Sequence, residues 1–333
     1  MSSIKNKRKM REGVCVNYNI VVLDRMTLGD DLDLSPAKAY GTLCVFDKTP
    51  PELVAERVAD ADVIFVNKVK LGKDNLKDAT RLKLICEAAT GYDNIDLDYC
   101  REHNIAVCNV PGYSVYSVTQ VTVSMVLNLV NHFKEYTRYT ASGEYTKGGN
   151  ANILTPVYHE LYGKTWGIVG YGAIGAGVGA VAKALGCKVL AFKKTPVDGI
   201  ECTDLDTLMR ESDIVTVHIP LSEETRGIIS NERIASMKKS AILVNTARGA
   251  VTDEFALCEA IKNGSIAGFG TDVYSVEPFD TDSPFYAIKD YDNVCLTPHM
   301  AWGTIEARER CFGEMLKNMQ AFFDGEIRNR VER

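Results

Sequence analysis

Short apolar runs alternate with segments of helical periodicity along most of this chain. Between residue 19 and residue 110 the runs predict five strands, at Ile20–Leu23, Leu43–Phe46, Val63–Val66, Leu84–Cys86 and Ala106–Val110. Amphipathic stretches between them predict helices at Pro51–Ala59 and Leu97–His103. Runs that are apolar on both faces and separated by helices are typical of a parallel sheet covered on both sides. The pattern therefore predicts an α/β unit.

A second series of the same kind begins at Thr165. It predicts six strands, at Trp166–Val169, Lys188–Phe192, Ile214–Val217, Ala241–Asn245, Gly268–Asp272 and Val294–Leu296. Six runs separated by helical stretches match a doubly wound sheet of the Rossmann type.

Two long segments are expected to cross between these units. Ser117–Phe133 is rich in β-branched residues, but 17 residues without a turn signal exceed ordinary strand length, so a helix is predicted. Thr304–Phe323 has helical spacing, and because no strand follows it, we expect it to pack back on the first unit.

The expected fold is therefore α/β, with two Rossmann-like or flavodoxin-like domains whose parallel sheets are separated by a hinged cleft. The predicted boundaries are residues 1–113 with 303–333 for a substrate-binding domain, and 114–302 for a dinucleotide-binding domain.

Composition narrows the class of protein. The chain of 333 residues is 46% apolar and 25% charged, which excludes disordered, collagen-like and disulfide-framework classes. A net charge of −6 gives no nucleic-acid footprint, although a local basic patch can hide in the total. Two stretches carry no formal charge, 104–133 apart from a possible protonated His132, and 165–182. Both are broken by proline, glycine or polar residues, so no membrane span is expected.

Cysteine, histidine and the N-terminus complete this picture. The ten cysteines form no C-x-x-C pair and lie mostly in apolar runs, which favours a reduced, cytoplasmic compartment. The five histidines lie far apart, so no metal site is expected. Residues 1–17 are basic and lack the apolar core of a signal peptide; a disordered tail or a wrongly chosen start codon both explain them.

The strongest local motif is a glycine-rich turn between a predicted strand and a helix. In this G-x-G-x-x-G, Gly170 allows the tight turn, Gly172 lets the backbone approach a pyrophosphate, and Gly175 brings helix and strand together. The motif predicts a dinucleotide site. Gly177 and Gly179 continue into the helix at a cost of about 1 kcal/mol each, and we expect close packing there.

The second strand of this unit lacks the acid that usually binds the adenosine ribose. No Asp or Glu occurs from Ala176 to Val197, and the strand ends in Lys193 and Lys194. Two ammonium groups without a carboxylate suit a 2′-phosphate, so NADP(H) is the favoured cofactor. The alternative is that both lysines are solvated and NAD(H) is accepted through backbone contacts.

Three polar residues follow successive predicted strands of the second unit, namely Arg248, Glu277 and His299. The carboxyl ends of such strands are where open α/β sheets bind ligands. Reduction of a carbonyl needs a cation to hold and polarise an oxo acid, a proton donor, and a carboxylate that keeps this donor protonated. Each residue alone is more often structural, but the three together predict a catalytic set.

From residue 19 to residue 325 the chain resembles the D-isomer-specific 2-hydroxyacid dehydrogenase family, closest to glycerate dehydrogenases, also called hydroxypyruvate reductases. The resemblance rests on Ala89-Thr90-Gly91-Tyr92-Asp93-Asn94-Ile95-Asp96, Asn109-Val110-Pro111-Gly112-Tyr113, the glycine turn, His218-Ile219-Pro220-Leu221, Thr246-Ala247-Arg248-Gly249, Glu277-Pro278 and Pro298-His299-Met300-Ala301-Trp302.

The resemblance implies roles for these residues. Arg248 would bind the substrate, His299 would be the acid/base, Glu277 would orient it, and the backbone amides of Thr90 and Gly91 would hold the carboxylate. Cofactor contacts would come from Gly170, Gly172, Ala173, Ile174, Gly175, Lys193, Ile219, Pro220, Thr225, Thr246, Ala247 and Asp272. Trp302 would wall the substrate pocket or serve as a domain-interface aromatic.

The expected activity is reversible reduction of a small 2-oxo acid, hydroxypyruvate or glyoxylate favoured, to the D-2-hydroxy acid. A D-lactate-type or branched 2-oxo acid reductase is the alternative enzyme, because Tyr116 stands where glycerate dehydrogenase-like sequences commonly carry an acid. An NAD(H)-sensing corepressor-like scaffold is the alternative of another class. The family also implies a homodimer built on the dinucleotide-binding domains, with the stretch 104–133 as part of its interface.

Overall fold

The computed structural model describes residues 17–333, and the predicted N-terminal extension falls outside this range except for its last residue. The chain divides into two compact units, one running up to Tyr113 and resuming at Arg308, the other spanning Ser114–Ala307. The chain thus leaves the first unit once and returns to it within the last helix, α11 (Ile305–Phe323).

The first unit is built on five parallel strands in the order β2-β1-β3-β4-β5. Their bounds are β1 Tyr18–Val22, β2 Gly41–Val45, β3 Val63–Val66, β4 Leu84–Glu87 and β5 Ala106–Cys108. The connecting helices are α1 Val54–Val58, α2 Lys73–Leu76 and α3 Leu97–Glu102, with 3₁₀ turns at Arg25–Leu28, Ser35–Ala39 and Pro51–Leu53. The strand order reverses between β1 and β3, which makes the carboxyl ends of these two strands a switch point.

Four strands of this sheet end elsewhere than predicted, and β1 and β2 each stop one residue early, at Val22 and Val45. β5 stops at Cys108 rather than Val110, because Asn109 and Val110 already lead into the turn at Pro111. β4 continues through Glu87, one residue past the predicted end, with Glu87 fully buried. A carboxyl side chain gives no strand signal in the sequence, although this one lies in the core.

Helix α11 covers this unit from Arg308 onward. Cys311, Met315 and Met319 are buried, as their helical spacing predicts, and the ring of Phe312 meets Phe65 edge to face at 6.1 Å. This packing completes the core of the first unit.

The second unit contains a parallel sheet of seven strands, in the order β12-β11-β10-β9-β6-β7-β8, which confirms the α/β fold class. The strands are β6 Thr165–Val169, β7 Lys188–Phe192, β8 Glu201–Cys202, β9 Ile214–Val217, β10 Ile242–Asn245, β11 Gly268–Thr271 and β12 Val294–Leu296. The prediction of six strands missed β8, since two residues at a sheet edge carry no periodic pattern. The order reverses between β6 and β9.

Seven helices accompany this sheet among the described residues. They are α4 Val115–Val130, α5 Phe133–Ala141, α6 Glu144–Gly148, α7 Ala173–Ala184, α8 Leu205–Glu211, α9 Asn231–Ala235 and α10 Glu254–Lys262, with 3₁₀ turns at Gly249–Val251 and Pro284–Ala287. Helix α4 confirms the choice of helix over strand, and the left-handed backbone of His132, with φ of 51°, separates it from α5.

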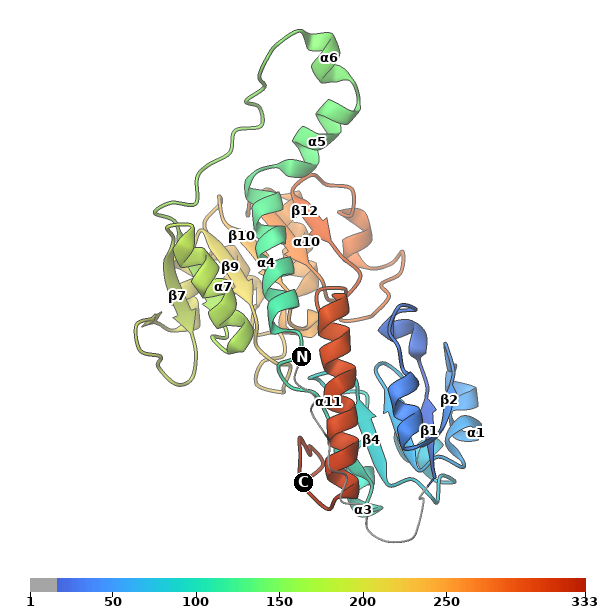
Figure 1. Cartoon of the computed structure of the whole chain (residues 1–333). Coiled ribbons are helices and arrows are strands. Elements are labelled where there is room, and N and C mark those ends of the chain that lie inside the picture. The colour runs from blue at the N-terminus through green and yellow to red at the C-terminus, as the bar shows by residue number, and fades with distance from the viewer. Residues whose placement is uncertain (1–16) are drawn as a thin grey trace, which may run out of the picture. The chain divides into compact units, whose positions relative to one another are not determined.

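Helices α4 and α7 lie side by side (Figure 1). A Cβ atom on Gly177 would lie 2.6 Å from Thr119 Oγ1, and one on Gly179 would lie 2.8 Å from Tyr171 Oη. The expected close packing is therefore the reason for both helical glycines.

Residues 133–162 form an arm that extends away from the sheet of the second unit (Figure 1). It consists of α5, α6 and the extended return to β6, and no residue of α5 or α6 is buried. The arm is tied to its unit by an ion pair between Arg138 and Asp292 and by Lys134 Nζ, which donates to Tyr291 O at 2.7 Å. The sequence analysis assigned no element here.

The nine cysteines within residues 17–333 are free thiols, and six of them are buried, which agrees with their place in apolar runs. Over the same residues no three His, Cys, Asp or Glu side chains gather as a metal site would require. None of the helices in this part of the chain is both long enough and apolar enough to cross a membrane.

Candidate active site

The three predicted catalytic residues follow three neighbouring strands of the second unit. Arg248 follows β10, Glu277 follows β11 and His299 follows β12, and these strands lie next to one another in the sheet. Because the strands are parallel, all three loops leave the same edge of the sheet.

His299 and Glu277 are in direct contact. His299 Nδ1 lies 2.6 Å from Glu277 Oε2, and Glu277 Oε1 accepts the backbone N–H of Tyr274 at 3.0 Å. The carboxylate therefore orients the ring through Nδ1, which leaves Nε2 as the atom able to exchange a proton with a substrate.

The backbone around His299 is held by Asp272, a buried residue at the end of β11. Asp272 Oδ1 accepts Thr297 Oγ1–H at 2.6 Å and the N–H of Met300 at 2.8 Å, and Oδ2 accepts the N–H of Ala301 at 2.8 Å. Burial raises the pKa of Asp272, while these three donors oppose the increase. His299 itself has a φ of 53°, an uncommon conformation for a non-glycine residue.

The sequence analysis expected Asp272 to contact the cofactor. In the structure its carboxylate binds the loop that carries His299. Spacing alone gave no signal of this contact, because Asp272 and Ala301 are 29 residues apart.

The Arg248 loop is shaped by buried Asn245. Asn245 Nδ2 donates to Arg248 O at 2.9 Å, and Asn245 Oδ1 accepts the N–H of Ala247 at 2.9 Å. A Cβ atom on Gly249 would lie 2.1 Å from the carbonyl carbon of Tyr274, so only glycine permits this approach. The loops that carry Arg248 and Glu277 are therefore in contact.

Glu254 on helix α10, which the sequence analysis missed, supports the loop that carries Glu277. Its Oε1 accepts the N–H of Ser275 at 2.7 Å, and burial raises its pKa. An acid in the first turn of a helix is too common for the sequence to single it out.

The glycine turn has the geometry that a dinucleotide requires. A Cβ on Gly170 would lie 2.7 Å from Ile219 Cγ2, and one on Gly175 would lie 2.2 Å from Gly170 O. Gly172, at the N-cap of α7, would meet nothing within 4 Å, and no side chain caps this helix. The first amides of α7, at Ala173 and Ile174, thus begin a helix beside open space at the switch point of the sheet, which fits a pyrophosphate.

Lys193 and Lys194, which the sequence analysis placed near the adenosine ribose, follow β7 and are both exposed. Lys194 Nζ lies 2.5 Å from Glu224 Oε2, in the loop that follows β9. Thr225 Oγ1 donates to Pro220 O at 2.7 Å and so shapes this loop. Sequence reasoning missed Glu224 because 30 residues separate it from Lys194.

Thr246, after β10, contacts polar side chains of two other segments of this unit. Its Oγ1 lies 2.9 Å from Thr122 Oγ1 and 3.5 Å from His218 Nδ1. Burial lowers the pKa of His218 to about 3, and its Nε2 has no partner among residues 17–333. The His218 ring is therefore neutral at physiological pH.

The predicted site residues divide between the two units. Thr90 and Gly91 lie in the first unit, where Thr90 Oγ1 donates to Val110 O at 2.9 Å and Asn109 Nδ2 donates to Thr90 O at 2.7 Å. All other predicted residues lie in the second unit, including the partly buried Trp302.

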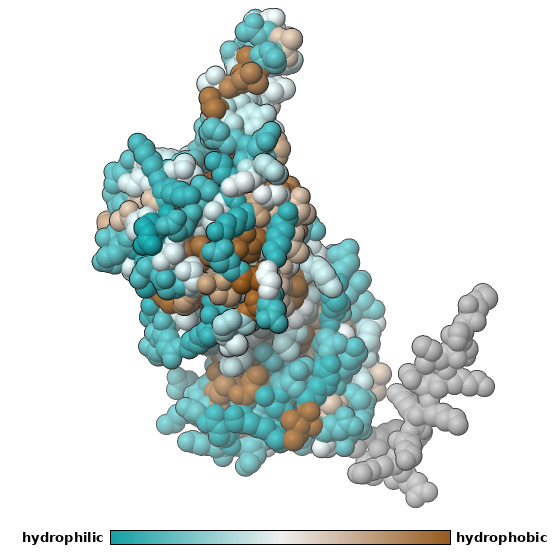
Figure 2. Space-filling view, turned by 90° about the vertical axis from the view of Figure 1, so that its left-hand side faces the viewer, coloured by the Kyte–Doolittle hydropathy of each residue, from teal (hydrophilic) through white to brown (hydrophobic). Residues whose placement is uncertain are grey.

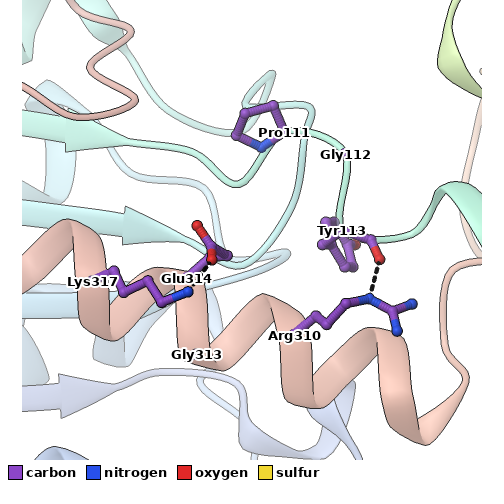
Figure 3. Close-up of a pocket in the computed structure, with 7 residues that line it drawn as sticks. All are labelled: Pro111, Gly112, Tyr113, Arg310, Gly313, Glu314 and Lys317. Carbon is purple, nitrogen blue, oxygen red and sulfur yellow. Dashed lines mark hydrogen bonds and ion pairs between the residues drawn. The ribbon is translucent and has the colours of Figure 1, made fainter.

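A pocket of about 310 Å³ lies in the first unit, between the turn at Pro111–Tyr113 and helix α11. Figure 3 shows Arg310 Nε donating to Tyr113 O, a contact of 3.1 Å, and Lys317 paired with Glu314. None of the predicted site residues lines this pocket.

Comparisons with known proteins agree with this geometry. Residues 123–301 match the family model described as "D-isomer specific 2-hydroxyacid dehydrogenase, NAD binding domain". A glycerate dehydrogenase from Methylorubrum extorquens is 38% identical over 85% of this chain and 89% of its own length. A hydroxypyruvate reductase from Blautia hydrogenotrophica is 34% identical over 94% of this chain and 99% of its own length.

Among solved structures, a D-lactate dehydrogenase from Aquifex aeolicus, complexed with NAD and lactic acid, superposes with a TM-score of 0.82. It is 30% identical, over 95% of this chain and 99% of its own. The chain belongs to the D-isomer specific 2-hydroxyacid dehydrogenase family, which confirms the resemblance seen in its sequence. It is an oxidoreductase that uses a nicotinamide cofactor.

Proposed function

We propose that this dehydrogenase reversibly reduces hydroxypyruvate or glyoxylate to the D-2-hydroxy acid, with His299 as its acid/base. The observation that carries this role is the 2.6 Å contact between His299 Nδ1 and Glu277 Oε2. It leaves Nε2 for the substrate, and the carboxylate stabilises the positive charge that the ring carries before it donates.

A nicotinamide cofactor held at the glycine turn would supply the hydride that C2 of the oxo acid receives. His299 Nε2 donates the proton that the carbonyl oxygen takes up, and the neutral ring then recovers a proton from solvent. In the oxidative direction the same nitrogen accepts the hydroxyl proton.

Arg248 and the first unit's Thr90–Gly91 amides are proposed to fix the substrate carboxylate. A guanidinium presents paired donors that suit a carboxylate, and it polarises the adjacent carbonyl. A carboxylate held at both oxygens presents only one face of C2, which accounts for a single stereoisomer of the product. Trp302 is proposed to wall the side-chain end of the substrate.

The substrate preference rests on the names of two relatives, glycerate dehydrogenase and hydroxypyruvate reductase. The D-lactate dehydrogenase among the structural neighbours favours pyruvate as the second candidate. Purified protein should be assayed with hydroxypyruvate, glyoxylate, pyruvate and 2-oxoisocaproate, each with NADPH and NADH. The proposal expects the highest kcat/KM with hydroxypyruvate or glyoxylate, and a higher value with pyruvate or 2-oxoisocaproate would contradict it.

Cofactor preference is proposed to favour NADP(H), with NAD(H) as the alternative. The two exposed lysines after β7 support a 2′-phosphate, whereas Glu224, paired with Lys194, places a carboxylate close to them. Substitution Lys193→Ala should lower kcat/KM for NADPH more than for NADH. Glu224→Gln should raise it for NADPH, because a repelling charge is removed. Wild-type protein with a higher kcat/KM for NADH would contradict the preference.

A homodimer formed through the arm of residues 133–162 is also proposed. Figure 2 shows hydrophobic residues on the arm. Leu154 and Val157, which belong to the arm, are 68% and 69% exposed. Apolar side chains on a projecting segment gain stability when a second copy covers them.

Sedimentation velocity tests the assembly. Wild-type protein should sediment as a dimer, and the double variant Leu154→Asp with Val157→Asp as a monomer. Phe255→Asp, which changes an exposed hydrophobic on α10, is the matched control and should stay dimeric. A monomeric wild-type protein, or a dimeric double variant, would overturn the proposal.

A further inference from the structure

Two buried carboxyl groups that the proposed mechanism does not use lie at the carboxyl ends of β1 and β4. Asp24 follows β1 and Glu87 ends β4, and both are almost inaccessible to solvent. The strand order of the first unit reverses between β1 and β3, so these groups lie at the edge where such sheets bind ligands.

Asp24 binds the loop that follows β3. Its carboxylate accepts the backbone N–H groups of Asn67, Lys68 and Val69, at 2.6 to 3.2 Å. Three N–H donors favour the charged form of a carboxyl group and oppose the effect of burial on its pKa.

Glu87 has a different environment. Its side chain is 0% exposed, Oε2 accepts Asn94 Nδ2–H at 3.1 Å, and Oε1 has no partner among residues 17–333. Burial raises its pKa well above the ordinary value, and nearby Asp24 acts in the same direction. With one donor against three, Glu87 rather than Asp24 holds the proton of this pair.

Asn94 connects Glu87 to two loops. Its Nδ2 also donates to Val69 O at 3.1 Å, and its carbonyl oxygen accepts the N–H of Leu71 at 2.9 Å. Asn94 itself closes the turn that follows Thr90 and Gly91. The partly buried Asn94 thus joins the 67–71 loop to the 88–94 loop, through its side chain at Val69 and its backbone at Leu71.

We propose that Glu87 is a positioning residue: as a neutral acid it fixes, through Asn94, the loop that presents the Thr90 and Gly91 amides to the substrate carboxylate. This inference rests on the proposed role of those amides. The titratable groups that face Glu87 are Asp24 after β1, Lys68 after β3, Cys86 on β4, Asp93 in the turn and Cys311 on α11.

The inference predicts a change in KM rather than kcat. Glu87→Ala should raise KM for the 2-oxo acid by about tenfold or more, because Asn94 loses a buried acceptor. Its kcat at saturating substrate and its Kd for the cofactor should stay close to wild type. Glu102→Ala, an exposed glutamate of α3, is the matched control and should change none of these values.

Glu87→Gln tests the protonation state and keeps the volume of the side chain. At neutral pH its KM should match wild type. As pH rises, the wild-type KM should increase while Glu87 ionises, and the Glu87→Gln KM should stay lower. A Glu87→Gln variant as impaired as Glu87→Ala at neutral pH would overturn the inference, since the charged form would then be required.

Hydrogen exchange of residues 67–71 and 88–94 measures loop order without turnover, and it should be faster in Glu87→Ala than in wild type. Two results would overturn the inference about Glu87 and leave the proposed function standing. One is unchanged hydrogen exchange in Glu87→Ala, and the other is an active Glu87→Ala variant with the KM of wild type. A wild-type protein that reduces no 2-oxo acid overturns the proposed function, and with it the link to substrate. Should Glu87→Ala not fold, the Glu87→Gln comparison decides.

Discussion

Glu277 Oε2 lies 2.6 Å from His299 Nδ1, while its other oxygen accepts the N–H of Tyr274. Replacing Glu277 by Gln keeps the shape of the contact and removes its charge. We expect kcat to fall by about tenfold or more, because the ring loses the anion that stabilises its protonated form. Steady-state kinetics at saturating cofactor measure this effect, with the exposed Glu326→Gln as the control. Wild-type kcat in Glu277→Gln would show that the carboxylate only supports the loop.

Asp272 gives a separate test of how the His299 loop is held. In Asp272→Asn an amide nitrogen, which cannot accept an N–H, replaces one of the two carboxylate oxygens. In one orientation the hydrogen bond from Ala301 is lost, and in the other those from Thr297 and Met300 are lost. The variant should unfold with a free energy lower by about 1–3 kcal/mol and should lose kcat as well. Urea unfolding and kinetics measure the two losses. Asp282→Asn, an exposed change, should alter neither.

Two helical glycines should respond to alanine with opposite signs. Gly177→Ala should destabilise the protein, since the new Cβ would lie 2.6 Å from Thr119 Oγ1. Gly313→Ala on α11 should stabilise it by about 0.5–1 kcal/mol, because a Cβ there meets nothing within 4 Å and the unfolded chain loses freedom. Thermal unfolding compares the pair. Equal shifts would contradict the account of α4–α7 packing.

His218 should make the protein sensitive to acid. Its pKa is lowered from 6.5 to about 3 by burial, so between these values the unfolded chain binds a proton that the folded one does not. Stability from His218 is therefore complete above pH 6.5 and is lost as pH falls toward 3. Between pH 7 and pH 5 wild type should lose about 2 kcal/mol more than His218→Asn. His159→Asn, which changes an exposed histidine, is the control and should lose as much stability as wild type between pH 7 and pH 5. If His218→Asn lost as much stability as wild type over this range, the prediction would be contradicted.

The sequence predicted the fold well where burial leaves a periodic pattern. Both parallel sheets, the glycine turn and helix α4 follow from apolar runs and turn chemistry. The arm of residues 133–162 and the strand Glu201–Cys202 did not, because neither has a buried face long enough to register. Propensity without burial is too weak to predict such elements.

In the candidate site, the sequence predicted that Arg248, Glu277 and His299 each follow the carboxyl end of a strand. The sequence could not predict contacts between loops that are far apart in the chain. Asp272 with Ala301 and Lys194 with Glu224 are two such pairs, 29 and 30 residues apart. Glu87 was missed for another reason: a carboxyl side chain interrupts the apolar run that marks a strand.

The central claim is that His299 transfers the proton in reduction of a 2-oxo acid, and the substitution His299→Gln tests it most directly. With hydroxypyruvate and saturating cofactor, the account predicts that kcat falls by about 10²- to 10⁴-fold. The Kd for the reduced cofactor, measured by fluorescence, should remain that of wild type. A kcat unchanged by His299→Gln, with cofactor bound normally, would contradict the account.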